Sequence, residues 1–253
     1  MSPDTEVCNI TFLPPSHSFG TLSLSLAIIF LLSSTNALAG IHINSSVLIK
    51  TVDQEHLEVS VFNDDKEQPA YVEVYVEVVK NPGADNETRS IVGDANEIEF
   101  IVSPNRLVVP PEGRKSVRMI QLTPVIESDR VYRVTFKPVI GKVSSDVTAI
   151  KILIAYQALI IIRPDEPRVD LAFERQGSRV TFVNKGNTVA SLKQFHQCGE
   201  FVAKKMDYKD APCEKYNGKR IYAGQSWTLD LNNDLPLYFL EEQLERTVLH
   251  ELR

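Results

Sequence analysis

The chain has 253 residues, of which 43% are hydrophobic and 24% are charged. These proportions are ordinary for a globular protein and exclude a chain that is disordered throughout. The net charge of −6 and the pI near 5.5 leave no broad basic surface to hold nucleic acid or an anionic membrane, so we expect neither as a partner.

An export signal is predicted at the N-terminus. Residues 26–32 form an uninterrupted apolar run, LAIIFLL, and the Ala-Leu-Ala sequence at 37–39 resembles a signal-peptidase cleavage site. The apolar run is too short for a comfortable membrane span. We therefore predict that residues 1–39 are a signal peptide that is removed. Residues 1–25 contain no Lys or Arg, unlike most signals, which leaves two alternatives: Met1 is not the true start, or the segment is an uncleaved membrane anchor.

The cysteines agree with export. Cys8 lies in the predicted signal, which leaves Cys198 and Cys213 as an even pair in an oxidising compartment. His196 raises the alternative of a metal site, but two thiols and one near-adjacent His lack the paired spacing of a zinc site. The pattern favours a disulfide, which would contribute about 3 kcal/mol by closing a loop of roughly 15 residues.

The first half of the exported chain has the pattern of short strands. Apolar and polar residues alternate as in half-buried strands at 57–61, 72–78, 98–102 and 130–139. Turn signals rich in Asn, Asp, Pro and Gly separate these runs at 63–69, 81–87 and 110–113. No stretch has helical periodicity with caps. The pattern predicts an all-β sandwich.

Residues 149–162, AIKILIAYQALIII, form an apolar run about twice as long as an ordinary sandwich strand. Alternate residues would make one continuous apolar row: Ile150, Ile152, Ile154, Tyr156, Ala158, Ile160 and Ile162. The other face holds Lys151 and Gln157 together with Leu153, Leu159 and Ile161. The run is either a central strand buried on both faces or a strand with one face left uncovered for another molecule's sheet. The pattern alone leaves both interpretations open.

Two prolines in RPDEPR, residues 163–168, predict a hinge between two domains. After it, short strand patterns return at 169–174, 179–184, 191–196, 227–231 and near Tyr238.

The sequence contains no recognisable catalytic motif. It has no Gly-rich phosphate loop and no G-x-S-x-G element. The five histidines are scattered, and none has a spacing that would place two metal ligands on one face. We expect a protein that is not an enzyme and that has no cofactor and no metal.

Four segments together resemble the periplasmic chaperones of chaperone–usher pili, most closely the divergent branch that serves colonisation-factor pili. NDDKEQPAYVEVYVE at 63–77 is similar to the family's first hairpin, and SPNRLVVPPEGRKSVR at 103–118 to its strand–turn–strand segment. DRVYRVTFKPV at 129–139 resembles the strand that follows, and IAYQALIIIRP at 154–164 resembles the donor strand and hinge.

The resemblance implies an all-β chain of two immunoglobulin-like β-sandwiches in an L or boomerang arrangement, located in the periplasm. Residues 40–163 would form the N-terminal domain, with a donor strand at 146–162. Residues 164–253 would form a C-terminal domain with the disulfide.

The implied activity is donor-strand complementation. Pilus subunits of this family are immunoglobulin-like folds that lack their last strand, and the chaperone's strand fills the open groove. An outer-membrane usher then receives the subunit. The side chains expected to enter the groove are Thr148, Ile150, Ile152, Ile154 and Tyr156. Three buried isoleucines would supply roughly 1.5–3 kcal/mol each before ordering costs.

One departure from the family concerns the cleft between the domains. Many members hold the subunit's terminal carboxylate with an Arg on the first strand and a Lys on the donor strand. Val47 and Leu159 occupy those positions here. The basic residues that would substitute for the pair are Lys50, Arg133 and Arg163.

Two other functions fit the sequence less well. If residues 1–39 were retained as an anchor, the chain would be a membrane-anchored, two-domain immunoglobulin-like adhesion or structural module. An exported enzyme on a β scaffold lacks any supporting motif. We also expect self-association of the free protein, because its apolar strand would otherwise be exposed.

Overall fold

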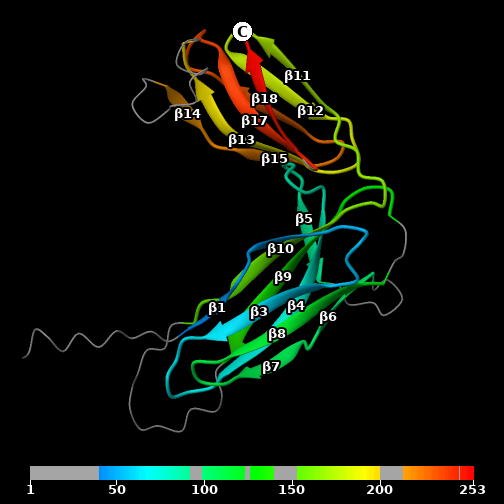
Figure 1. Cartoon of the computed structure of the whole chain (residues 1–253), viewed down its shortest axis with the longest axis vertical. Helices are drawn as coiled ribbons and strands as arrows, with labels where there is room; N and C mark the ends of the chain where they lie inside the picture. The colour runs from blue at the N-terminus through cyan, green and yellow to red at the C-terminus, as the bar shows by residue number, and fades with distance from the viewer. Residues whose placement is uncertain (1–39, 92–98, 123–125, 140–152, 200–212, 245) are drawn as a thin grey trace, which may run out of the picture. The chain divides into compact units, whose positions relative to one another are not determined.

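The computed structural model describes residues 40–91, 99–122, 126–139, 153–199, 213–244 and 246–253 (Figure 1). These residues belong to one compact unit that spans Ala39–Arg253. All regular elements in the described ranges are β-strands arranged as two sandwiches, which confirms the predicted fold class. No helix suited to crossing a membrane occurs among them. The predicted signal at 1–39 lies outside the described residues.

The first sandwich consists of a four-stranded and a six-stranded sheet. The four-stranded sheet has the order β1 (Ile41–Ile43), β3 (Leu57–Asn63), β8 (Arg114–Gln121), β6 (Phe100–Ser103). The six-stranded sheet has the order β2 (Val47–Lys50), β10 (Tyr156–Ile162), β9 (Arg130–Val139), β4 (Ala70–Lys80), β5 (Thr88–Ile91), with β7 (Arg106–Val109) also paired to β4. All pairings are antiparallel except that of β10 with β2, which is parallel.

The chain changes sheets between β1 and β2. The backbone N–H of Asn44 donates to Ser60 on β3 (3.2 Å), whereas the carbonyl of Ser46 accepts from the N–H of Leu159 on β10 (2.9 Å). Only Ser45 therefore lies between the residue bonded to one sheet and the residue bonded to the other. This crossing fixes where β2 begins to cover the edge of β10.

The first core is built from alternate residues of both sheets, as the period of two requires. Val59, Val61, Val117 and Met119 face Val134, Phe136, Ala158 and Ile160, all with no measurable exposure. We call this side of the six-stranded sheet its inner face, and the opposite side its outer face.

A buried asparagine organises the turn predicted at 63–69. The Nδ2 of Asn63 donates to the carbonyls of Gln68, Val109 and Pro110, and its Oδ1 accepts from the N–H of Asp65. Because a buried amide is costly unless its donors and acceptor are satisfied, these bonds fix the turn against the β7–β8 connection.

The second sandwich consists of a three-stranded and a five-stranded sheet. The first has the order β11 (Leu171–Gln176), β12 (Arg179–Asn184), β16 (Ser226–Asp230). The second has the order β14 (Glu214–Tyr216), β13 (Ala190–Gln197), β17 (Leu237–Gln243), β18 (Arg246–Leu252), with β15 (Lys219–Ile221) also paired to β13. Strands 130–139 and 179–184 match the sequence prediction to the residue. The short strands β5, β14 and β15 and the last strand β18 were not predicted.

An aromatic cluster fills the second core. Phe239 stacks on Phe195 with ring centroids 5.1 Å apart and meets Phe182 edge to face at 5.3 Å. Trp227, the single tryptophan of the chain, stacks on Phe182 at 5.3 Å. Offset and edge-to-face aromatic pairs of this kind add to the stabilisation from burial.

A β-bulge in β13 changes which of its side chains enter the second core. The register against β17 shifts between Lys193 and His196, and Gln194 has a φ of 52°. Leu192 and Phe195 consequently both enter the core although they are three residues apart. After the bulge, Gln197 points inward, where its Nε2 donates to the carbonyls of Asn233 and Leu235.

The aromatic core yields a stability prediction. Phe239→Ala is expected to lower the free energy of unfolding of the second sandwich by about 3–5 kcal/mol, because it leaves a cavity among rings that cannot close around it. Leu249→Ala on the neighbouring strand, where Leu249 is 46% exposed, should cost less than about 1 kcal/mol. Urea unfolding followed by the fluorescence of Trp227 measures both. Equal losses would contradict this account of the core.

Candidate functional site

The described part of the long apolar run is a strand with two differently covered faces. On the inner face, Ala158, Ile160 and Ile162 belong to the first core, and Tyr156 packs against it. On the outer face, Leu159 and Ile161 pack with Val79 and Val131 of the same sheet. They also pack with Val189 and Tyr222, which belong to loops of the second sandwich. Residues 158–162 are therefore buried on both faces, as one of the two interpretations of the sequence expected.

The edges of β10 are covered unequally. β9 pairs with it over the whole range from Tyr156 to Ile162, but the parallel pairing with β2 covers only Leu159 to Ile162. The N–H of Leu159 points toward β2, so the period of two directs the backbone groups of Gln157 to the same side. Among the described strands none pairs with that edge before Leu159, which leaves an open sheet edge.

The residues just before β10 expose large apolar side chains. Ile154 is 60% exposed and Leu153 is 36% exposed. β10 begins at Tyr156, so residues 153–155 of the predicted donor strand 146–162 are not in a strand here. Antiparallel extension would set Ile154 beside Pro138, which has no N–H to donate, and β2 gives no support on the other side. Thr148, Ile150 and Ile152 lie outside the described residues.

The two apolar positions that the sequence resemblance aligns with the family's basic pair are direct neighbours. Val47 on β2 pairs with Leu159 on β10, and Leu159 pairs in turn with Arg133 on β9. Arg133 also pairs with Glu77 on β4. Paired residues point to the same side of a sheet, so these four side chains form a row across the outer face. The cation in this row, Arg133, lies on β9, the strand next to β10.

Two of the three candidate anchors share this outer face. Arg163 follows Leu159 and Ile161 at the period of two, and its backbone N–H donates to the carbonyl of Lys50 (3.0 Å). The Nε of Arg133 and the Nε of Arg163 are both buried with no hydrogen-bond partner among the described residues. Buried donors are rarely left unsatisfied, so the hydrogen bonding of these two guanidinium groups is incomplete within the described residues.

Arg163 also lines a pocket of about 590 Å³. Other lining residues are Ile49, Thr51 and Val189 and the three further basic residues Lys193, Arg220 and Arg246. The carboxylate in the lining, Glu242, accepts a hydrogen bond from Lys193 (2.6 Å), and this interaction holds the pKa of Glu242 below its usual value. The pocket therefore has an excess of positive charge and suits an anionic group.

The third candidate anchor, Lys50, lies on the other face. It pairs with Ile162, which belongs to the first core, and Lys50 itself is only 9% exposed. Its ammonium group donates to the carbonyl of Thr51 at 3.4 Å. The structure thus separates Lys50 from the two arginines, although all three are close in the sheet.

A polar group beside the open edge was missed in the sequence. The Nε2 of Gln157 donates to Oγ1 of Thr135 (3.0 Å) and to Oε2 of Glu77 (3.3 Å). These residues come from three strands, and only their register brings them together. The sole signal in the sequence was the polar Gln157 within an apolar run.

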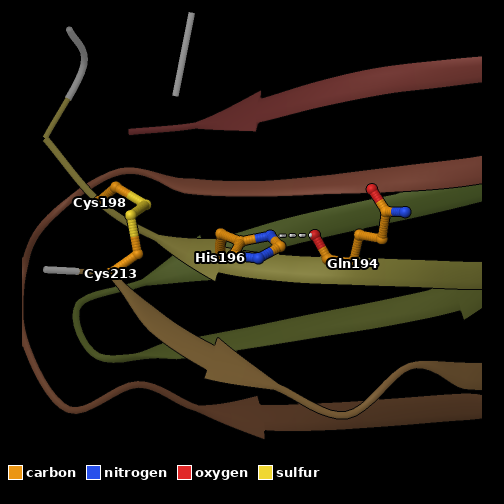
Figure 2. The surroundings of a disulfide bond; sticks show 4 residues. All are labelled: Gln194, His196, Cys198 and Cys213. Atoms are coloured by element: carbon orange, nitrogen blue, oxygen red, sulfur yellow. Dashed lines mark hydrogen bonds between the residues drawn. A yellow bond between two sulfur atoms is a disulfide. The ribbon is translucent and has the colours of Figure 1, made fainter. Parts of the chain in front are cut away.

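The predicted disulfide is present between Cys198 and Cys213 (Figure 2). It lies where β13 ends and β14 begins, with a sequence separation of 15. Figure 2 shows His196 turned back along its strand, with Nδ1 at 2.8 Å from the carbonyl oxygen of Gln194. The two sulfur atoms are bonded to each other, so they do not form the alternative metal site with His196. Within the described ranges, no group of three or more His, Cys, Asp or Glu is placed to hold a metal.

Comparison with known proteins relates the chain to fimbrial proteins. No protein-family model matches the chain. The chain is 33% identical to a CS1 fimbrial subunit of Escherichia coli over 168 residues, which are 62% of this chain and 67% of that protein.

Solved structures share the fold over nearly their whole length. The class 5 fimbriae chaperone CfaA is 25% identical, with a TM-score of 0.60, and the match covers 85% of this chain and 99% of that one. A chain of the chaperone–tip adhesin complex of CFA/I fimbriae is 23% identical, with a TM-score of 0.59 and coverage of 84% and 98%. A chain of the Salmonella enterica SafA pilin–SafB chaperone complex, at 13% identity, has a TM-score of 0.58 and coverage of 86% and 99%.

The sequence relation to the CS1 protein and the fold shared with CfaA point to the same family. The chain belongs to the family of periplasmic pilus-assembly chaperones and, within it, to the branch of the class 5, CFA/I-type chaperones.

Proposed function

We propose that this protein is a periplasmic chaperone that binds, folds and caps pilus subunits by donor-strand complementation and delivers them to an outer-membrane usher. The observation that supports this most directly is the unequal covering of β10. Residues 159–162 are held between β9 and β2, whereas no described strand pairs with the β2-side edge before Leu159, and Ile154 is 60% exposed.

The backbone supplies the first half of the interaction. An incomplete pilin sheet would pair with the open edge at Gln157 and the residues before it, which is β-strand addition. The main-chain hydrogen bonds give affinity without dependence on the pilin sequence.

Alternating side chains supply the second half. Ile154 continues the row of Tyr156 and Ala158 if the strand extends on binding, and Thr148, Ile150 and Ile152 would continue it further. Each isoleucine that enters a pilin groove contributes roughly 1.5–3 kcal/mol by burial, reduced by the cost of ordering the segment. In the free protein the same surface favours self-association.

A substitution in the row tests this proposal. Ile154→Asp and Ile152→Asp are each expected to abolish binding of the pilin, because the groove would have to bury an unpaired carboxylate. Since Ile154 is exposed, the fold should be unchanged. A periplasmic pull-down with native mass spectrometry should detect a one-to-one complex with a small immunoglobulin-like pilin for the wild type alone.

The matched control for that experiment is Leu249→Asp, which places the same charge at an exposed apolar position of β18. It should bind pilins like the wild type. Persistent binding by both isoleucine variants would refute the proposed row, and absence of any pilin on the wild-type protein would refute the function.

We further propose that Arg133 and Arg163 hold the terminal carboxylate of the pilin in place of the basic pair that is absent at Val47 and Leu159. Both guanidinium groups lie on the outer face with a buried, unpartnered Nε, and Arg163 lines the basic pocket. Lys50 faces the first core and is the weaker candidate for this contact.

Arg133→Gln and Arg163→Gln are each expected to weaken binding of the pilin about tenfold to hundredfold, the usual range for a hydrogen bond to a charged group. Titration calorimetry measures the change. Lys137→Gln, an exposed position on the same strand and face as Arg133, is the control and should have little effect. A pilin with an amidated C-terminus should bind wild type and both variants equally; a further loss in the variants would argue against carboxylate binding.

The proposed location requires removal of residues 1–39. The intact mass of the exported protein is therefore expected to correspond to a chain that begins at Gly40, recovered in the periplasmic fraction. A protein that keeps residues 1–39 and fractionates with membranes would instead favour the anchored adhesion module.

A further inference from the structure

A turn of the second sandwich makes a compact set of contacts with the first. The segment 187–189, between β12 and β13, meets residues 127–129, just before β9. Four hydrogen bonds join the two segments: Asn187 Nδ2 to the carbonyl of Glu127 (3.1 Å), Asp129 N–H to the carbonyl of Asn187 (3.0 Å), Thr188 Oγ1 to Asp129 Oδ1 (2.8 Å) and Val189 N–H to Asp129 Oδ2 (2.6 Å).

The turn that presents these groups is built rigidly. The Nδ2 of Asn184, which is fully buried, donates to the carbonyls of Thr188 and Ile221 (both 2.8 Å), and its Oδ1 accepts from the N–H of Gly186. A Cβ at position 186 would collide with the backbone carbonyl of Arg168. Only glycine allows this close approach. Gly186 therefore lets the turn lie directly against residues 168–170, the linker that precedes β11.

The Asp129 carboxylate is the ionisable group of this contact. Its two oxygens each accept one hydrogen bond, from a neutral hydroxyl and a neutral amide. Among the described residues, the guanidinium of Arg163, which follows β10, lowers the pKa of Asp129 by its charge, and Asp129 in turn raises the pKa of the Tyr222 hydroxyl, which follows β15. The pKa of this Tyr222 hydroxyl, which burial raises, is also affected by the charges of Arg133, Arg220 and Glu87.

We propose that Asp129 is a proton-sensitive positioning residue: its carboxylate holds the Thr188–Val189 segment against the first sandwich, and uptake of a proton by this carboxylate tightens the contact.

The direction follows from burial. Burial raises the pKa of Asp129 from 3.8 to about 6, and this effect outweighs the opposite effects of Thr188, Val189 and Arg163. Opening the contact would return the carboxylate to water, where its pKa would again be near its ordinary value. The closed form therefore binds the proton more tightly, so the added stability is fully present below about pH 4 and is lost as the pH rises through about 6.

The contact also shapes the basic pocket. Val189, whose N–H bonds to Asp129, and Arg163, whose charge faces it, both line that pocket. If the proposed function is correct, a tighter contact in mild acid also fixes the surface that receives the carboxylate of the pilin. This consequence rests on the proposed function, whereas the proton-sensitive contact itself does not.

Hydrogen exchange of the Val189 amide in the free chain tests the proposal. After correction for the intrinsic exchange rate, protection of this amide is expected to be about tenfold greater near pH 5 than near pH 7.5, as a pKa change from 3.8 to about 6 implies. Asp129→Asn keeps the shape and one acceptor, so it should fold and show equal protection at both pH values. Asp170→Asn, which removes an exposed carboxylate of the linker, is the control and should keep the wild-type difference.

Three results would overturn the proposal: equal wild-type protection at the two pH values, greater protection at the higher pH, or a pH effect that persists in Asp129→Asn. The amide of the fully buried Val59 in the first core reports global opening in the same samples. Its protection should not change with the protonation of Asp129. Because no pilin is present, the result decides the role of Asp129 whether or not the pilin-binding experiments succeed. A positive exchange result in a protein that captures no pilin would reject only the consequence for the pocket.

Discussion

The parallel pairing of β10 with β2 is the constraint on which the proposed site depends. It covers Leu159 to Ile162 and stops there, because the chain before Val47 crosses to the other sheet. It secures the edge of residues whose side chains are buried alternately in the first core and against Val79 and Val131 on the outer face, at roughly 1.5–3 kcal/mol for each large side chain. This firmly held half allows residues 153–155 to lie outside a strand, with Ile154 60% exposed, without loss of the fold. A longer β2 would close the edge that a partner needs.

The same pairing decides where positive charge is available. With Val47 beside Leu159, the middle of the outer face is apolar, and these side chains pack with Val79, Val131 and Ile161. Arg133 and Arg163 lie at the border of this apolar group, where burial removes water from Nε without supplying an acceptor. An external carboxylate would complete their hydrogen bonding.

Local patterns predicted the strands well because alternation depends only on neighbouring residues. Strands 130–139 and 179–184 and the inward row of Tyr156, Ala158, Ile160 and Ile162 follow directly from it. Pairing of a strand edge with a distant segment leaves no such pattern in the neighbouring residues. Nothing in residues 149–162 reveals that β2, about a hundred positions earlier, covers one half of the edge and leaves the other. Asp129 likewise resembled an ordinary turn carboxylate, since its partners Thr188 and Val189 are about sixty positions away.

A donor segment must protect a pilin and yet release it. If the proposed donor segment inserts three isoleucines, the burial gain of roughly 5–9 kcal/mol is reduced by the cost of ordering residues 153–155, which are not in a strand. A segment already fixed as a strand would bind more tightly, because that cost would fall on folding and not on binding. The short β10 therefore favours a complex stable enough to cap a groove and weak enough for a better-fitting strand to replace it. The absence of strand structure at 153–155 is consistent with a chaperone whose product must leave.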